Sequence, residues 1–255
     1  MKTPEKYNKT QLHPENCFER HVFHRDQVGH FLRWSYALRK LELGMRVLDF
    51  GCGSGNLAEV MYRNRYKGEL YLGLDIRTQT IKSNQEKFKD VPWVKFEQAD
   101  LVKPDFNLQK ENWDLICCFE VAEHCGKQNV TQLLRNIKAQ MSIETLLLIS
   151  TPVYDEKVGA ADNHTYDSGD GRGIAVHELT YVEFKNLLEA EFKIEQSWGV
   201  FASVKDYKHK LESYPGLPEI YQKLHGYFDS NILSNIMAPL FPEQSRNVMW
   251  ECKLK

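Results

Sequence analysis

The stretch Met45-Arg-Val-Leu-Asp-Phe-Gly-Cys-Gly-Ser-Gly55 joins a run of apolar residues to a turn with glycine at every second position. The apolar run predicts a buried strand over about 45–50, and the apolar spacing after the turn predicts a helix over about 56–65. Alternate glycines permit a tight turn with positive φ and let a ligand approach the backbone where a Cβ would clash. The following helix directs the positive end of its dipole to the same place. This strand–turn–helix unit therefore predicts a ligand site.

The chain after this unit repeats the alternation of short apolar segments with amphipathic stretches. This pattern is typical of a mostly parallel sheet covered by helices on both faces, so we predict a doubly wound α/β fold with seven strands. The closing strand, NVMWECKL, is the one that we expect to be antiparallel. The other strands after the first are predicted at about 69–75, 94–98, 113–119, 145–150 and 193–199, and helices at about 77–89 and 128–141.

One more helix is predicted from a capping box, because Thr180 is followed three residues later by Glu183. Three segments lie outside the alternation. Residues 1–43 are expected to be helical around GHFLRWSYALRKL, residues 152–178 to form a long mobile loop, and residues 200–245 to form an ordered lid. We predict a single domain, 1–255, made of the N-terminal cap 1–43, the cofactor-binding core 44–200, the lid 200–245 and the last strand 246–255.

The composition fits one sizeable core and limits the kinds of partner. The chain has 255 residues, of which 42% are hydrophobic and 27% charged. Lysine and arginine together number 33 against 35 aspartates and glutamates, so the formal net charge is −2. Because there is no basic surplus to attract a polyanion, a nucleic-acid partner is not favoured.

The cysteines and the N-terminal residues indicate the cellular compartment in which we expect the protein. Six cysteines are scattered, and Cys117 and Cys118 should point to opposite faces of one strand, so no disulfide framework is predicted. The opening MKTPEKYNKT is polar, and no apolar stretch is long enough to cross a bilayer. We expect a soluble cytoplasmic protein without a membrane partner, either a monomer or a homodimer.

Charge selects the kind of ligand. Asp75 ends the second predicted strand about twenty residues after the turn, where a carboxylate can accept both hydroxyl protons of a ribose. Asn56 stands where a dinucleotide-binding loop has its last glycine, and no Gly-Lys-Ser/Thr follows the turn. Asp49 would repel a pyrophosphate and attract an ammonium or sulfonium group. A cationic nucleoside is therefore predicted in preference to NAD or ATP.

The turn resembles that of the class I S-adenosylmethionine-dependent methyltransferases, whose first motif is Asp-x-Gly-x-Gly-x-Gly. The resemblance implies a Rossmann-like methyltransferase fold with S-adenosyl-L-methionine as cofactor. It assigns the methionine part of the cofactor to the turn, the ribose to Asp75 and the adenine to Ile76, Ala99 and Asp100. The complete set of implied cofactor-binding residues is Asp49, Gly51, Cys52, Gly53, Gly55, Asp75, Ile76, Ala99, Asp100, Phe119 and Glu120.

Two later segments resemble one branch of this family. Phe119-Glu-Val-Ala-Glu-His124 and His177-Glu-Leu-Thr180, with Phe184 after it, are similar to segments of ubiquinone-type and other small-molecule methyltransferases. The resemblance covers about residues 44–200. It implies methyl transfer to an oxygen or nitrogen atom of a small-molecule acceptor.

Such an acceptor can need a base to remove its proton. His124, His164 and His177 are predicted on loops at the carboxyl ends of the strands, where open α/β sheets bind ligands. Glu120 and Glu123 follow the fourth strand, and Glu120 is our fourth catalytic candidate. Each of these residues could instead have a structural role, as a helix cap or a plain surface residue. No metal is predicted, since the N-terminal histidines lack further ligands at suitable spacing.

Alternative functions stay open at this point. A nucleic-acid methyltransferase is disfavoured, since the fourth strand is followed by Glu-Val-Ala-Glu and not by the Asn/Asp-Pro-Pro-Tyr/Phe or Pro-Cys motifs of DNA enzymes; an RNA enzyme is still open. A catalytically silent cofactor-binding scaffold would keep the same motifs. A nicotinamide-dependent dehydrogenase would bind NADH tightly.

Overall fold

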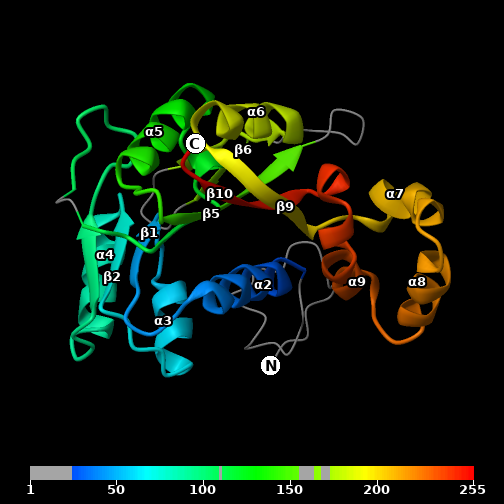
Figure 1. The fold of residues 1–255 in the computed structure, drawn as a ribbon, viewed down its shortest axis with the longest axis horizontal. Helices are drawn as coiled ribbons and strands as arrows, with labels where there is room; N and C mark the ends of the chain where they lie inside the picture. The colour runs from blue at the N-terminus through cyan, green and yellow to red at the C-terminus, as the bar shows by residue number, and fades with distance from the viewer. Residues whose placement is uncertain (1–24, 109–110, 155–163, 168–172) are drawn as a thin grey trace.

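The computed structural model describes residues 25–108, 111–154, 164–167 and 173–255. Its main sheet has the strand order β3-β2-β1-β4-β5-β10-β9, with a short eighth strand, β8, beside β5 (Figure 1). The bounds of these strands are β1 (Arg46–Phe50), β2 (Leu70–Asp75), β3 (Val94–Gln98), β4 (Leu115–Phe119), β5 (Leu146–Tyr154), β8 (Leu179–Thr180), β9 (Lys193–Phe201) and β10 (Asn247–Lys253).

The sheet is parallel except at one strand. β1 pairs in parallel with β2 and β4, β2 with β3, and β4 with β5. β10 runs antiparallel to both β5 and β9, as predicted for the closing strand. Because all the parallel strands end at the same edge, the residues that follow β1, β2, β3 and β4 gather there.

Helices cover both faces of the sheet, and each face has its own apolar cluster (Figure 1). One face packs against α5 (Val130–Ala139) and α6 (Tyr181–Glu191), and the other against α2 (Arg25–Lys40), α3 (Asn56–Arg63) and α4 (Thr78–Lys87). Cys117 belongs to one cluster and Cys118 to the other, which confirms that they point to opposite faces. The doubly wound α/β prediction is confirmed.

The capping box at the start of α6 is present. The Thr180 hydroxyl accepts a hydrogen bond from the Glu183 amide at 3.2 Å, and the Glu183 carboxylate accepts one from the Thr180 amide at 2.9 Å. Together these bonds satisfy two amide groups at the helix start that have no partner within the helix.

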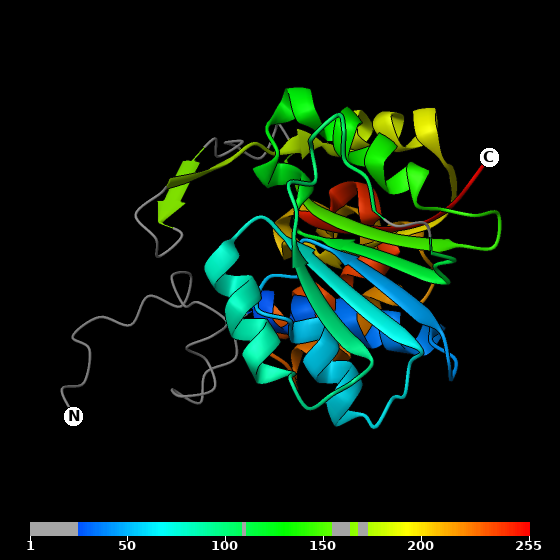
Figure 2. The ribbon, with the colours of Figure 1, turned by 90° about the vertical axis from the view of Figure 1, so that its left-hand side faces the viewer.

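Residues 152–178 differ from the single irregular loop that we predicted. β5 continues to Tyr154, and β6 (His164–Asp167) pairs antiparallel with β7 (Gly173–Val176). Residues 155–163 and 168–172 lie outside the described residues. The glycine and aspartate content of the sequence 167–173 hid the two short segments with strand character that precede and follow it. This hairpin extends away from the main sheet (Figure 2).

The predicted lid, 200–245, begins with the end of β9 and continues as a small helical lobe with its own aromatic cluster. Tyr207 and Phe241 stack with ring centroids 5.0 Å apart, so these aromatic residues form a local core. The lobe lies beyond β9, and its helix α9 contacts α2 (Figure 1). Its elements are α7 (Val204–Tyr207), η4 (Lys208–Ser213), α8 (Leu217–His225), α9 (Ser230–Ile236), η5 (Ala238–Leu240) and η6 (Pro242–Gln244).

The N-terminal helix α2 confirms the helical part of the predicted cap, and polar contacts fasten it to β10. The Tyr36 hydroxyl donates to Glu251 at 2.8 Å, and the Lys40 ammonium pairs with the same carboxylate at 2.8 Å. Residues 1–24, with His13, His21 and His24, lie outside the described residues. Across the described ranges, each helix is too short or too polar to cross a membrane.

Candidate cofactor and acceptor site

The glycine turn after β1 is held against β2. The amides of Gly51 and Cys52 both donate to the Leu74 carbonyl at 2.8 Å. Gly51, Gly53 and Gly55 all have positive φ, as the sequence predicted. A Cβ at Gly51 would overlap the Val121 side chain, so only glycine fits there. The turn therefore packs closely against the segment that follows β4.

Asp49 at the end of β1 is a buried acid, only 4% exposed. Burial and, to a smaller extent, the nearby charge of Asp75 raise its pKa to about 7, in spite of the hydrogen bond that the Tyr71 hydroxyl donates to it at 2.5 Å. Within the described part of the chain, no cationic side chain pairs with Asp49. A buried carboxylate that lacks a counter-charge fits a positively charged ligand beside the turn.

Asp75 at the end of β2 lies next to the same turn. Its carboxylate accepts a hydrogen bond from the Gly53 amide at 3.0 Å. It also accepts three bonds from Arg77: from the amide at 2.9 Å, from Nε at 3.1 Å and from Nη2 at 3.3 Å. The predicted ribose acid is therefore in the predicted place, but an arginine that the sequence analysis did not single out already contacts it.

The residues predicted to frame an adenine lie beside Asp75. The Ala99 amide donates to the Asp75 carbonyl at 3.0 Å, which ties the end of β3 to the end of β2. Asp100 follows, and its carboxylate accepts a bond from the Val102 amide at 3.2 Å. Ile76 is 59% exposed, which leaves a large apolar side chain available to a ligand. The structure thus brings Asp75, Ile76, Ala99 and Asp100 together.

Two residues near the turn have roles that the sequence analysis did not foresee. Asn84 on α4 is buried and donates from Nδ2 to the Gly53 carbonyl at 2.7 Å. It lies between Ile81 and Phe88 on the apolar face of the helix, and a polar residue on such a face was the signal that could have found it. The Cys52 side chain is buried toward the core, where burial raises the pKa of its thiol. Only the backbone of Cys52 is placed to face a ligand at the turn.

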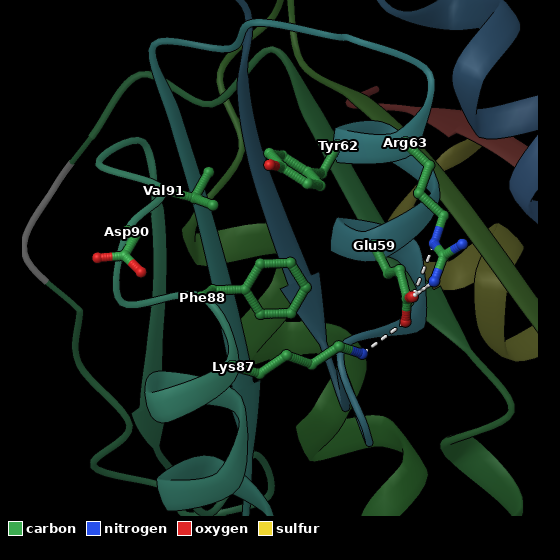
Figure 3. Close-up of a pocket in the computed structure, with 7 residues that line it drawn as sticks. All are labelled: Glu59, Tyr62, Arg63, Lys87, Phe88, Asp90 and Val91. Atoms are coloured by element: carbon green, nitrogen blue, oxygen red, sulfur yellow. Dashed lines mark hydrogen bonds and ion pairs between the residues drawn. The ribbon is translucent and has the colours of Figure 1, made fainter.

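A surface hollow of about 450 Å³ lies elsewhere, between the last turns of α3 and α4 (Figure 3). Glu59 bridges Lys87 and Arg63 across it, with 2.5 Å between the charged atoms in each pair. Because α3 and α4 run back from the carboxyl edge of the sheet, their last turns lie at its opposite edge. We therefore exclude this hollow from the candidate site.

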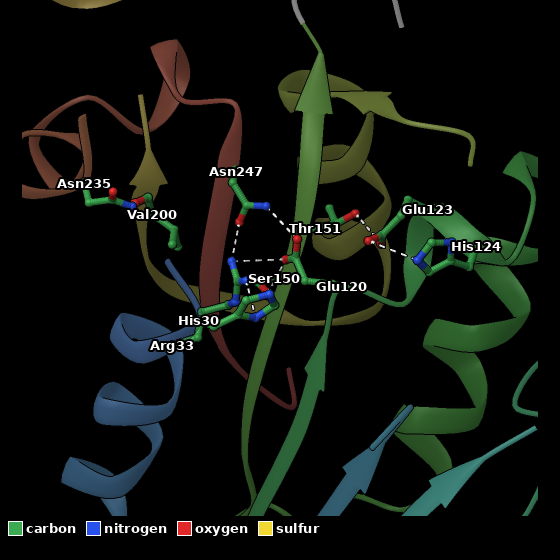
Figure 4. Close-up of polar contacts among 10 residues, drawn as sticks. All are labelled: His30, Arg33, Glu120, Glu123, His124, Ser150, Thr151, Val200, Asn235 and Asn247. Carbon is green, nitrogen blue, oxygen red and sulfur yellow. Dashed lines mark hydrogen bonds and ion pairs between the residues drawn. The ribbon is translucent and has the colours of Figure 1, made fainter. Parts of the chain in front are cut away.

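Glu120, the residue after Phe119 at the end of β4, has an unusual backbone. Its φ of 57° is in the left-handed region, which costs energy for a residue other than glycine and occurs often at functional sites. Its carboxylate accepts hydrogen bonds from Ser150 at 2.8 Å and from Asn247 at 2.6 Å (Figure 4). Phe119 is partly buried and packs toward the α2, α3 and α4 face.

Arg33 on α2 supplies the positive charge beside Glu120, with its Nη1 3.5 Å from the carboxylate (Figure 4). It is buried, donates to Oδ1 of Asn247 at 2.9 Å and contacts Nδ1 of His30 at 2.9 Å. An arginine can only donate, so His30 accepts at Nδ1. Nε of Arg33 has no hydrogen-bond partner among the described residues. The sequence analysis did not identify Arg33 or Asn247. Arg33 lies one helical turn before the buried Ala37, and a charged residue on this apolar face could have indicated a buried polar contact.

Glu123 is the second carboxyl group of this region, and it lies deeper. Thr151 donates to it at 3.1 Å, and Nε2 of His124 lies 3.7 Å from its other oxygen (Figure 4). Burial, with the neighbouring charge of Glu120, raises its pKa well above the usual range. The His177 amide donates to its carbonyl at 2.7 Å.

The four predicted catalytic residues are therefore not equally placed. Glu120, His124 and His177 lie around the ends of β4 and β5. His164 is in β6, on the hairpin that extends away from the sheet, and its side chain lies outside the described residues (Figure 2). The structure brings three of the four candidates to one region.

This sheet has a glycine turn after β1, an acid at the end of β2 and a buried acid with no cationic partner among the described residues. Together these features define a Rossmann-like protein with a site for a positively charged nucleoside. Residues 22–195 match the sequence profile of a family described as methyltransferase domain. Because the match spans more than half of the 255 residues, the chain belongs to this family of class I S-adenosylmethionine-dependent methyltransferases, as its motifs predicted.

Known proteins agree with this assignment. A ubiquinone biosynthesis O-methyltransferase from Actinobacillus pleuropneumoniae is 29% identical over 126 residues, which are 47% of this chain and 52% of the relative. The chain thus matches about half the length of such curated relatives. An S-adenosylmethionine-dependent methyltransferase from Clostridium acetobutylicum has a similar fold, with a TM-score of 0.58, 10% identity and coverage of 94% of this chain and 95% of the other. The magnesium protoporphyrin IX methyltransferase of Synechocystis, solved with bound S-adenosylhomocysteine, gives a TM-score of 0.54 at 16% identity and covers 91% and 83% of the two chains.

Proposed function

We propose that this protein binds S-adenosylmethionine and transfers its methyl group to an oxygen or nitrogen atom of a small-molecule acceptor. The observation that carries the proposal is the buried Asp49, which has no cationic partner in the part of the chain that the structure describes and lies next to the glycine turn of a methyltransferase domain. The similarity to ubiquinone biosynthesis O-methyltransferases supports a small-molecule acceptor.

The residues around the turn fit this cofactor, which supplies a methyl group on a positively charged sulfur. A ligand can approach the backbone of Gly51 to Gly55 closely, and Asp49 would stabilise a positive charge on that ligand. We assign the ribose to Asp75 and the adenine to Ile76, Ala99 and Asp100. The buried guanidinium of Arg33, with a free Nε, suits the carboxylate at the other end of the ligand.

The acceptor side of the proposed site contains two carboxyl groups in different environments. Arg33, Asn247 and Ser150 all contact the side chain of Glu120 and hold it in one orientation. Glu123 is buried, and burial raises its pKa well above the usual range. The side chain of Glu120 is 22% exposed and that of Glu123 is 5% exposed, so Glu120 is the carboxyl group that an acceptor can reach. We therefore propose Glu120 as the group that accepts a proton from the acceptor, with His124, His177 and His164 as further candidates.

We assign the selection of the methyl acceptor to the segments outside the cofactor-binding core. Methyl transfer from sulfur is an in-line displacement, which depends on holding the acceptor close and on excluding water. The α2 helix and the lobe after β9 contact each other and flank the side of the sheet where Glu120 lies. We propose that they bind the acceptor within a single-domain cytoplasmic enzyme.

The test is methyl transfer from S-adenosylmethionine with a tritiated methyl group. Purified protein is incubated separately with a small-molecule extract, with RNA and with protein from the same cells. We expect label in the small-molecule fraction, and less of it with Glu120→Gln. Label in RNA alone would favour the nucleic-acid alternative. Binding of the cofactor without label in any fraction would favour the silent scaffold.

A further inference from the structure

The Asp75 carboxylate has no room for a further donor in this structure. A carboxylate offers about four lone-pair positions, two on each oxygen. Oδ1 accepts from the amide and Nε of Arg77, and Oδ2 accepts from the Gly53 amide and Nη2 of Arg77. Every position of the predicted ribose acid is therefore filled by a group of the protein itself.

Only two of these four bonds can be exchanged without rebuilding the turn. The amides of Gly53 and Arg77 belong to the backbone on either side of the carboxylate. The guanidinium bonds come from a flexible side chain, and they occupy one position on each oxygen. A ribose presents two neighbouring hydroxyl groups, which need one position on each oxygen of a carboxylate that binds both. The guanidinium thus fills the two positions that a ribose diol requires.

The greater solvent exposure of the Arg77 side chain allows it to leave the Asp75 carboxylate. The Arg77 side chain is 37% exposed, whereas that of Asp75 is 8% exposed. The guanidinium can therefore turn into water, while the carboxylate stays in place. Nη2 lies 3.6 Å from the position of a Cβ on Gly53, so the guanidinium occupies the space directly over the turn. An ion pair with this degree of exposure is weak, and a ligand can displace it.

We propose that Arg77 is an intramolecular competitor of the cofactor ribose, which holds Asp75 in the free protein and leaves it when the ribose binds. The inference rests on the proposed function, since it needs an adenosyl ligand at Asp75. Arg77 then sets the affinity of the site through the cost of its displacement.

The test is calorimetric titration with S-adenosylhomocysteine, which requires no acceptor and no turnover. Arg77→Met removes the guanidinium and keeps the backbone amide that bonds to Asp75. We expect binding roughly two- to fivefold tighter than wild type, the gain from removing one weak ion pair. Arg63→Met is the matched control, because Arg63 also pairs with a carboxylate, that of Glu59, on the distant end of α3. It should leave the affinity unchanged, and Arg77→Gln should reproduce the gain if the methionine variant folds poorly.

A pair of simpler ligands tests the chemistry of the competition. Adenosine has the diol, and 2′,3′-dideoxyadenosine lacks it. The gain in Arg77→Met should appear with adenosine and be absent with the dideoxy compound. An equal gain with both ligands would overturn the inference, since the arginine would then act by bulk alone. Unchanged or weaker binding of S-adenosylhomocysteine to Arg77→Met would overturn the role of Arg77 and leave the proposed function intact. A wild-type protein that binds no S-adenosylhomocysteine would overturn the proposed function as well.

Discussion

Binding of S-adenosylmethionine should weaken about tenfold when the pH falls from 8 to 6, because the ligand's positive charge requires an ionised Asp49. Burial raises the pKa of this carboxyl group to about 7 in the free protein, and a bound cation would lower it again. At pH 8 most of the groups are ionised before the ligand arrives. At pH 6 about one in ten is ionised, so binding has to remove a proton at a cost of ~1.4 kcal/mol.

Calorimetric titration at pH 6 and pH 8, repeated in buffers of different ionisation enthalpy, measures both the affinity and the protons released. Wild-type protein should release a proton on binding at pH 6 and little at pH 8. Asp49→Asn should bind more weakly at pH 8 and lose the difference between the two pH values. S-adenosylhomocysteine lacks the sulfonium charge, so its affinity should depend less on pH. An unchanged pH dependence in Asp49→Asn would refute the reasoning, since another group would then be titrating.

Other substitutions have expected outcomes of their own. Asp75→Ala should weaken binding of S-adenosylhomocysteine by roughly 1–3 kcal/mol through lost charged hydrogen bonds, and an unchanged affinity by calorimetry would remove Asp75 from the site. Gly51→Ala should lower the free energy of unfolding by more than about 1 kcal/mol, because its φ is +76° and its Cβ would meet Val121; a urea titration with no change would contradict this. Arg33→Met should cost roughly 3 kcal/mol of stability by leaving Glu120 without its cation, and adding Glu120→Gln should recover part of the loss in a double-mutant cycle. Glu120→Gln alone should slow methyl transfer, and full activity would exclude it as the base.

Features that depend on neighbours along the chain could be predicted from the sequence. The turn from Asp49 to Gly55, the acid Asp75 and the capping box at Thr180 each combine residues within one local unit, so spacing alone located them. The antiparallel last strand followed from the order of elements. The strand pair β6 and β7 within 152–178 was missed because the glycine and aspartate residues of 167–173 outweighed two short strand segments in the sequence.

Features that depend on distant contacts could not be predicted. Arg33 and Asn247 are 214 positions apart in the sequence, and they meet only because α2 packs against β10. Glu120 was a candidate from the sequence, but its contact with Arg33 could not be predicted, since it results from that packing. Arg77 is close to Asp75 in sequence, yet only the geometry shows that its guanidinium fills the ribose positions.

A glycine turn beside a buried acid that has no cationic partner among the described residues should accept a positively charged adenosyl ligand. Equilibrium binding of radiolabelled S-adenosylmethionine to the purified protein, with S-adenosylhomocysteine and NADH as competitors, tests it most directly. We predict saturable binding of one molecule per chain, displaced by S-adenosylhomocysteine and unaffected by NADH. Displacement by NADH, or the absence of saturable binding, would contradict the claim.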